Sequence, residues 1–160
     1  MTHAPLLAGV HHLKLPVADL RRSQAWYESR LGYRLSEEFH NHGQLAGIGM
    51  EHPNGGPGIA FVLAPELANA AAGFDYFAIG VPDKSSLQEL AARLDGFGES
   101  HAGVHRATLG WILPLLHDPD GHEVRFYSLA HHTTPDPGRV HVVHDAVATA
   151  RRIAAELGEE

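Results

Sequence analysis

The sequence contains no cysteine, little positive charge and no long apolar run. Zero cysteines among 160 residues exclude disulfides and thiolate metal sites. The 12 Lys and Arg residues against 19 Asp and Glu give a net charge of −7, which argues against nucleic acid as a partner. No apolar run reaches the roughly 18 residues that span a bilayer, so no membrane partner is expected. The start, MTHAPLLAGV, lacks the features of a signal peptide, which favours a cytoplasmic protein.

The remaining composition is that of an ordinary globular chain. Hydrophobic residues make up 44% and charged residues 19% of the sequence. The length suits one well-packed domain, or two half-size modules that share a core. Histidine is frequent, with 14 residues, and each is a candidate ligand or base.

An internal repeat organises most of the chain. Residues 10–19 (VHHLKLPVAD) resemble residues 74–83 (FDYFAIGVPD), and both alternate like strands. Each stretch ends in an aspartate suited to cap a helix, and apolar residues at helical spacing follow in 20–31 and 87–94. A strand followed by a helix is therefore expected twice.

A proline–glycine turn marks the later part of each half. HPNG at 52–55 matches DPDG at 118–121, and apolar strands are predicted after them at 59–63 and 124–129. Two further strands fit before each turn, around 33–39 and 45–51, and around 101–107 and 111–117. Each half, about 9–63 and about 74–129, is predicted to be strand–helix–strand–strand–strand. Together they would form a single domain over 1–130, and 131–160 is interpreted as a proline-containing linker and an amphipathic C-terminal helix.

Three motifs carry a resemblance to a known family. HHLKLPVADL opens the first half at 11–20, WYESRLGY follows at 26–33, and DPDGHEVRFY closes the second half at 118–127. The chain resembles the vicinal oxygen chelate superfamily of glyoxalases, bleomycin- and fosfomycin-resistance proteins and extradiol dioxygenases. The resemblance implies an α+β fold in which two βαβββ modules form a cup-shaped mixed sheet with outer helices. It also implies a homodimer and, in the enzymes, a divalent metal held by the first and last strands.

Strand alternation predicts which side chains face such a cup. Leu13 and Leu15 would lie under the first helix and Val124 and Phe126 against a helix, because alternate residues share a face. The opposite faces would then present His12, Lys14, Tyr76, Ala78, Glu123, Arg125 and Tyr127.

The family's metal positions hold an unusual set of residues here. His12 matches the first ligand, but the counterparts are Tyr76, Arg125 and either Ile59 or Ala60. Arg125 repels a cation, and Glu123 lies roughly 6.6 Å along the strand from the expected position. The sequence thus predicts no metal and no other cofactor.

Three functions are compatible with these residues. The first is a metal-free protein, similar to the bleomycin-resistance branch, that binds a small aromatic or oxygenated molecule; an acidic chain suits a cationic drug, but Arg125 does not. The second is a metal-free enzyme for isomerisation, ring opening or cyclisation, in which Arg125 binds an oxyanion and His12 or Glu123 moves a proton. The third is a metal-dependent lyase, transferase or dioxygenase with an atypical set, His12, Tyr76 and Glu123. The first is preferred.

Plainer interpretations stand beside these roles. Arg125 and Glu123 would form an exposed ion pair worth under about 1 kcal/mol, and His12 and Tyr76 would be packing residues. Lys14 is interpreted as a charge at the rim, Trp111 as core or as a platform for an aromatic ligand, and Tyr127 as a ligand contact. The other histidine pairs are interpreted as loop or helix surface: His40 and His42, His131 and His132, His141 and His144.

Overall fold

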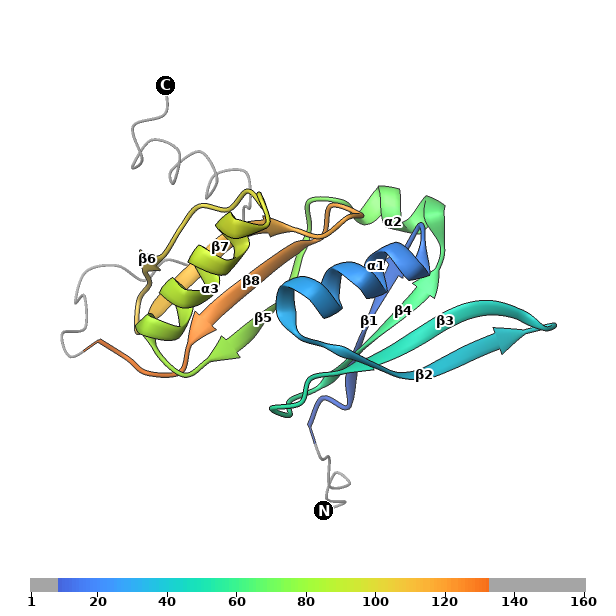
Figure 1. The fold of residues 1–160 in the computed structure, drawn as a ribbon, viewed down its shortest axis with the longest axis horizontal. Helices are drawn as coiled ribbons and strands as arrows, with labels where there is room; N and C mark the ends of the chain where they lie inside the picture. Colours follow the sequence, from blue (N-terminus) through green and yellow to red (C-terminus); the bar gives the residue numbers. More distant parts are fainter. Residues whose placement is uncertain (1–8, 133–160) are drawn as a thin grey trace, which may run out of the picture. The chain divides into compact units, whose positions relative to one another are not determined.

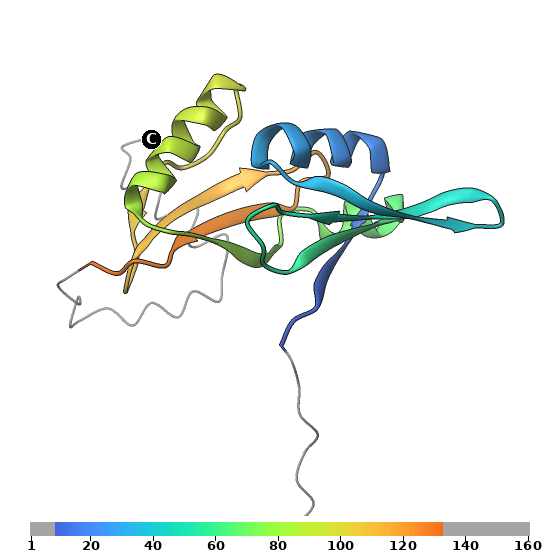
Figure 2. The same cartoon turned by 60° about the horizontal axis from the view of Figure 1, so that its bottom comes forward.

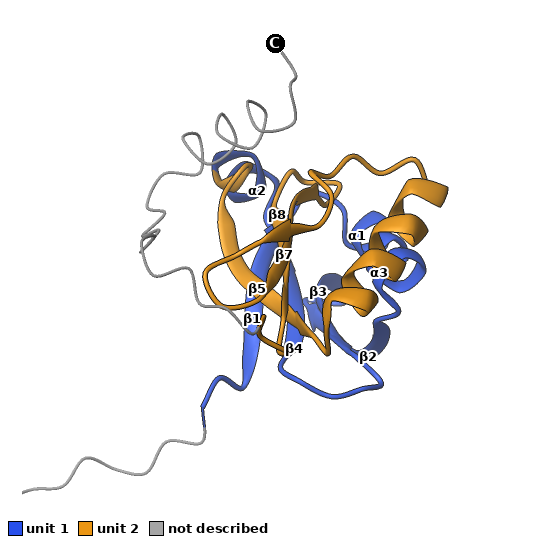
Figure 3. Ribbon diagram, turned by 90° about the vertical axis from the view of Figure 1, so that its left-hand side faces the viewer, with its two compact units in different colours: residues 1–70 blue, residues 71–160 orange. Residues whose placement is uncertain are grey.

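The computed structural model describes residues 9–132, and its chain divides into two compact units, residues 1–70 and 71–160 (Figures 1 and 3). The linker after residue 132 and the C-terminal helix predicted from the sequence lie outside the described residues. None of the helices in the described part is long and apolar enough to cross a membrane.

The first unit is one βαβββ module. Its sheet has the order β1-β4-β3-β2, in which β1 pairs parallel with β4 and the other neighbours are antiparallel. Its elements are β1 (His12–Val17), α1 (Leu20–Trp26), a π-helical turn (Tyr27–Leu31), β2 (Arg34–Asn41), β3 (Gln44–Glu51) and β4 (Gly58–Leu63).

The second unit repeats this plan. Its sheet has the order β5-β8-β7-β6, again with a parallel pair between its first and last strands. Its elements are β5 (Asp75–Val81), α3 (Lys84–Gly96), β6 (His105–Arg106), β7 (Trp111–His117) and β8 (Glu123–Ser128). Two βαβββ modules with mixed four-stranded sheets, as predicted for this α+β chain, are therefore confirmed. A short helix that the sequence reading missed, α2 (Pro65–Ala71), leads from one unit to the next.

Helix α1 begins and ends as its residues dictate. The Asp19 carboxylate accepts hydrogen bonds from the backbone N–H groups of Arg21 and Arg22 at 2.9 and 3.0 Å, which caps the first turn. The final turn widens into a π-helix and stops at Gly32, whose φ of 80° a side chain would disfavour.

Helix α1 covers one face of the first unit's sheet (Figure 2), and the buried core residues of the unit lie between them. The Tyr27 ring is fully buried, and its centroid lies 4.8 Å from that of Phe61 on β4. Ile48, Met50 and Ile59 are buried in the same unit. The alternate residues of β3 and β4 therefore point to the other face of the sheet.

Helix α3 packs on the second sheet in a similar way. Asp83 caps it by accepting hydrogen bonds from the Ser86 N–H and Oγ, each at 2.9 Å. These bonds lower the pKa of the Asp83 carboxyl. Leu87 and Leu94, on one side of the helix, are fully buried, in agreement with the predicted helical spacing.

Both predicted turns form, whereas one predicted strand is much shorter than expected. The Gly55 and Gly121 N–H groups donate to the carbonyls of His52 and Asp118, each at 2.9 Å. The strand predicted over 101–107 shrinks to the two residues of β6. Gly103, with φ of 77°, interrupts the extended backbone before β6.

Candidate functional site

The first unit contains a hollow on the sheet face opposite α1, which we call the first-sheet hollow. It has room of about 100 Å³ and is lined by residues of all four strands and by His11. Its floor is made of small residues on β3 and β4: Gly49, Gly58 and Ala60. The register pairs Ala60 with Gly49 of β3, so small residues meet across these two strands, and it pairs Ala60 with Lys14 of β1 on the other side.

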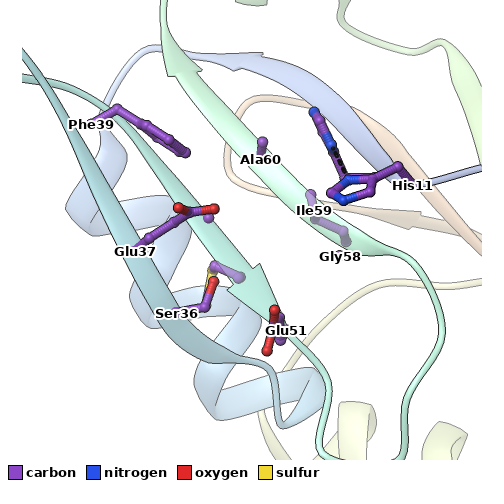
Figure 4. A pocket seen from close by; sticks show the side chains of 11 residues that line it. His11, Ser36, Glu37, Phe39, Glu51, Gly58, Ile59 and Ala60 are labelled. Atoms are coloured by element: carbon purple, nitrogen blue, oxygen red, sulfur yellow. Dashed lines mark hydrogen bonds between the residues drawn. The ribbon is translucent and has the colours of Figure 1, made fainter.

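The side chains around this floor come from β2, β3 and the start of β1. Figure 4 shows Glu37 and Phe39 reaching over the sheet from one side, with His11 on the other. A bulge in β2 places both Ser36 and Glu37 against Gly49. A Cβ atom added to Gly49 would lie 2.8 Å from Glu37 Cγ and 3.2 Å from Ser36 Oγ, so any larger residue would force these side chains to shift.

His12 belongs to the first-sheet hollow, as does its neighbour. The Nδ1 atoms of His11 and His12 lie 2.9 Å apart, and their rings meet edge to face. Because one Nδ1 must accept the hydrogen bond, at least one of the two imidazoles is neutral in this contact. Lys14 is exposed on the same strand and does not line the hollow.

The second unit brings three charged side chains together, which we call the carboxylate–arginine cluster. Arg125 Nη2 lies 3.0 Å from Glu123 Oε1 and 3.0 Å from Asp75 Oδ2. The side chains of Glu123, Arg125 and Asp75 are 2%, 19% and 24% exposed. The predicted contact between Glu123 and Arg125 is thus present, but it is a largely buried interaction rather than an exposed ion pair.

The sequence reading did not select Asp75, because an irregularity in the register changes its face. Asp75 pairs with Glu123, yet Ala78, three residues later, pairs with Arg125. Burial raises the pKa of Asp75, and the nearby Glu123 charge adds to this, whereas Arg125 lowers it. With both carboxyls ionised the cluster carries two negative charges and one positive charge, so Arg125 is more than neutralised where it stands.

An unusual backbone conformation supports the Glu123 carboxylate. Its Oε1 accepts a hydrogen bond from the Leu115 N–H at 3.2 Å. Leu115 has φ of 63°, in a bulge of β7 that follows the buried Pro114. Left-handed backbone at a branched residue is costly and is often found beside functional sites.

The other ligand-binding candidates of the second unit do not take part in the cluster's ion pairs. Tyr76 is 38% exposed and packs edge to face against Phe74 and His122. Lys84 Nζ lies 3.9 Å from the Trp111 ring centroid, so a cation already covers one face of this ring. Tyr127 is half-buried, and this burial raises its pKa.

The alternation of small and large residues in the sequence signals the first-sheet hollow. In 47–51 and 58–61, small residues alternate with large apolar ones, so one face of the sheet lacks bulk: Gly47, Gly49, Gly58 and Ala60. Glu37 and Phe39 could not be assigned to this face, because a bulge shifts the alternation of β2.

Comparison with known proteins shows one family and one fold. Residues 9–126 match the model of the glyoxalase/bleomycin resistance protein/dioxygenase superfamily. A domain from a Frankia species described by the same three names has 21% identity and a TM-score of 0.64, with 79% of this chain and 100% of that chain covered.

Two further solved structures show how varied proteins with this fold are. An antibiotic-binding protein, TnmS3, from a Streptomyces species has 16% identity and a TM-score of 0.65, with 78% of this chain and 98% of that chain covered. A lactoylglutathione lyase from Agrobacterium tumefaciens has 17% identity and a TM-score of 0.61, with 76% of this chain and 94% of that chain covered. A search of curated proteins gave no match.

Proposed function

Because the chain belongs to the glyoxalase/bleomycin resistance protein/dioxygenase superfamily, we propose that it binds a small aromatic or oxygenated organic molecule without the metal ion of the family's enzymes. The observation that carries this proposal is the first-sheet hollow, which has a floor of small residues and an exposed aromatic wall. Concave sites with apolar walls and a few polar groups are the usual form of small-molecule sites. TnmS3, which shares the fold, is an antibiotic-binding protein.

The residues at the family's metal positions do not fit a divalent ion. The register assigns the fourth position to Ala60, since Lys14 pairs with Ala60 as Ala78 pairs with Arg125. His12 is then accompanied by Tyr76, Arg125 and Ala60. Within residues 9–132, no group of three or more His, Asp or Glu side chains is arranged to hold a metal. Three or more nitrogen or carboxylate ligands would be needed.

Metal analysis tests the metal-free part of this proposal. Protein purified without chelator should contain far less than one equivalent of manganese, iron, nickel or zinc, and adding these ions should not raise its melting temperature. Near-stoichiometric metal that is lost in His12→Ala would contradict the proposal and restore a metal-dependent enzyme.

A thermal-shift screen tests the binding site. Small aromatic natural products should raise the melting temperature in the presence of EDTA, and Ala60→Leu should abolish the shift because leucine fills the floor. Ala60→Ser is the matched control, since it adds one oxygen and leaves most of the room. Shifts that survive Ala60→Leu would place the ligand elsewhere.

A second candidate function, acid–base catalysis without a metal, is favoured by the carboxylate–arginine cluster. Asp75 is the more exposed of the two carboxyls, and burial raises its pKa, which favours a group that can hold and release a proton. Glu123 is held by Arg125 and by a backbone N–H, so it is better suited to position Arg125 than to move a proton. Turnover of a substrate that falls at least 100-fold in Asp75→Asn would support this function over binding alone.

We also propose that the protein forms a homodimer, as its family resemblance implies. The segment 131–160 would then be an appendage to a single domain over residues 1–130. Light scattering of the full chain and of residues 1–130 tests both points, with a dimer expected in each case.

A further inference from the structure

Building on the proposed function, we infer that the first-sheet hollow selects a planar aromatic cation. Its ring would lie on the small-residue floor beside Phe39, and its positive nitrogen would lie between Glu37 and Glu51. This inference names the ligand class, which the proposed function leaves open.

The shape of the hollow suits one flat ring system. About 100 Å³ is comparable to the space that one aromatic ring occupies, and because Glu37 and Phe39 at its edge are exposed, a second fused ring can extend out of the hollow. Phe39 is 46% exposed, unusually open for a phenylalanine, and its ring lies over Gly47, where an added Cβ would be 3.6 Å from Cδ2. A ligand ring on the floor would therefore lie beside the Phe39 side chain, since both line the hollow.

The charge of the lining is negative. Glu37 and Glu51 line the hollow, and no lysine or arginine does. Neither carboxylate has an ion-pair partner in the described part of the chain, although Arg34 is the register partner of Glu51. By contrast, the adjacent Glu38 is paired with Arg21 at 2.6 Å.

The histidine pair does not reverse this charge. In the contact between the two Nδ1 atoms, at least one imidazole is neutral. Lys14, the lysine of β1, pairs with Ala60 and lies on the same face of the sheet, but it does not line the hollow, and its single charge does not offset two carboxylates. A positive ligand nitrogen therefore meets two carboxylates and an aromatic face, both of which attract cations, whereas an anion meets two like charges.

Arg125 does not oppose a cationic ligand. It is held between two carboxylates in its own cluster, which has a net charge of −1 when both are ionised (2 negative, 1 positive). The positive charge of Arg125, which in the sequence spoke against a cationic ligand, is therefore already balanced inside the protein.

Calorimetry with three bicyclic probes of similar size tests this inference at pH 7.5: N-methylquinolinium (cation), quinoline (neutral) and 2-naphthoate (anion). The cation should bind tightest and the anion weakest, and the affinity of the cation should fall as salt rises from 0.05 to 0.5 M, roughly the range over which screening becomes strong. Replacing both Glu37 and Glu51 by glutamine should weaken the cation about tenfold, and should change quinoline binding less than about twofold. Glu38→Gln is the matched control and should leave all three affinities unchanged, because Glu38 does not line the hollow.

The outcomes separate this inference from the proposed function. If quinoline or 2-naphthoate binds as tightly as the cation, or the double glutamine variant binds the cation normally, the inference is wrong. In that case binding that is lost in Ala60→Leu would still support the proposed function. If none of the three probes binds at millimolar concentration, both the inference and the assignment of the hollow as an aromatic site are overturned.

Discussion

Replacing Arg125 by methionine should destabilise the protein strongly at neutral pH and much less in acid. Methionine retains an unbranched apolar stem like that of arginine but removes the charged guanidinium group. The change leaves the Glu123 carboxylate, which is 2% exposed, and Asp75, which is 24% exposed, without their shared cation.

The size of the effect follows from the burial of the partners. Removing one member of a buried ion pair costs about 3–5 kcal/mol, because the remaining charge stays out of water. Asp75 and Arg125 keep some contact with solvent, so we expect about 3 kcal/mol at pH 7.5. Without Arg125, nothing offsets the burial that raises the pKa of Asp75, so protonation should recover part of the loss at pH 4.5.

Urea denaturation followed by tryptophan fluorescence measures this loss at both pH values. Arg21→Met is the matched control, since Arg21 forms the shorter ion pair with Glu38 but is 57% exposed. The free energy of unfolding of this control should fall by less than about 1 kcal/mol. A loss below about 1 kcal/mol in Arg125→Met at pH 7.5, or an equal loss at both pH values, would refute the reasoning from burial.

Three further predictions concern local features. Asp19→Ala should lower the free energy of unfolding by about 1 kcal/mol in urea denaturation, because two N–H groups of α1 lose their acceptor; an unchanged midpoint would contradict the cap. His42→Asn should raise the free energy of unfolding by about 0.5 kcal/mol in the same assay. His42 and Gly43 form a two-residue hairpin turn with φ of 49° and 79°, for which Asn-Gly is favoured. A lower midpoint of urea denaturation would speak against this turn. Asp75 has a folded pKa above its ordinary 3.8, so its contribution to stability should decrease as pH rises from 3.8 through the folded pKa. Asp75→Asn should remove this dependence of the free energy of unfolding on pH. The prediction is contradicted if the free energy of unfolding of Asp75→Asn differs from that of the unaltered protein by a constant amount from pH 3.5 to 6.5.

The repeat was predictable because its landmarks are local. Aspartate caps, proline–glycine turns and alternating strands each depend on a few neighbouring residues, and the two sheets follow from their order. Asp19 and Asp83 cap helices as expected, and the turns that end in Gly55 and Gly121 form. These features needed no information about distant contacts.

The candidate site was less predictable because bulges change which residues share a face. Strand alternation correctly joined Glu123 with Arg125, but an irregular register in β5 added Asp75, and a bulge in β2 added Glu37. No single-residue pattern signals such irregularities in advance. The burial of Glu123 also depends on β7, where the Leu115 N–H donates to its carboxylate, and strand alternation does not predict this contact.

The parallel pairing of first and last strands has a consequence for how each unit assembles. His12 pairs with Gly58 and Ala78 pairs with Arg125, separations of 46 and 47 residues, whereas β2 and β3 meet through a two-residue turn. Closing the longer loops costs more chain entropy, so we expect the hairpins to form first and the parallel pairs last. During synthesis the first sheet can be completed once residue 63 has emerged from the ribosome, before any strand of the second sheet has emerged.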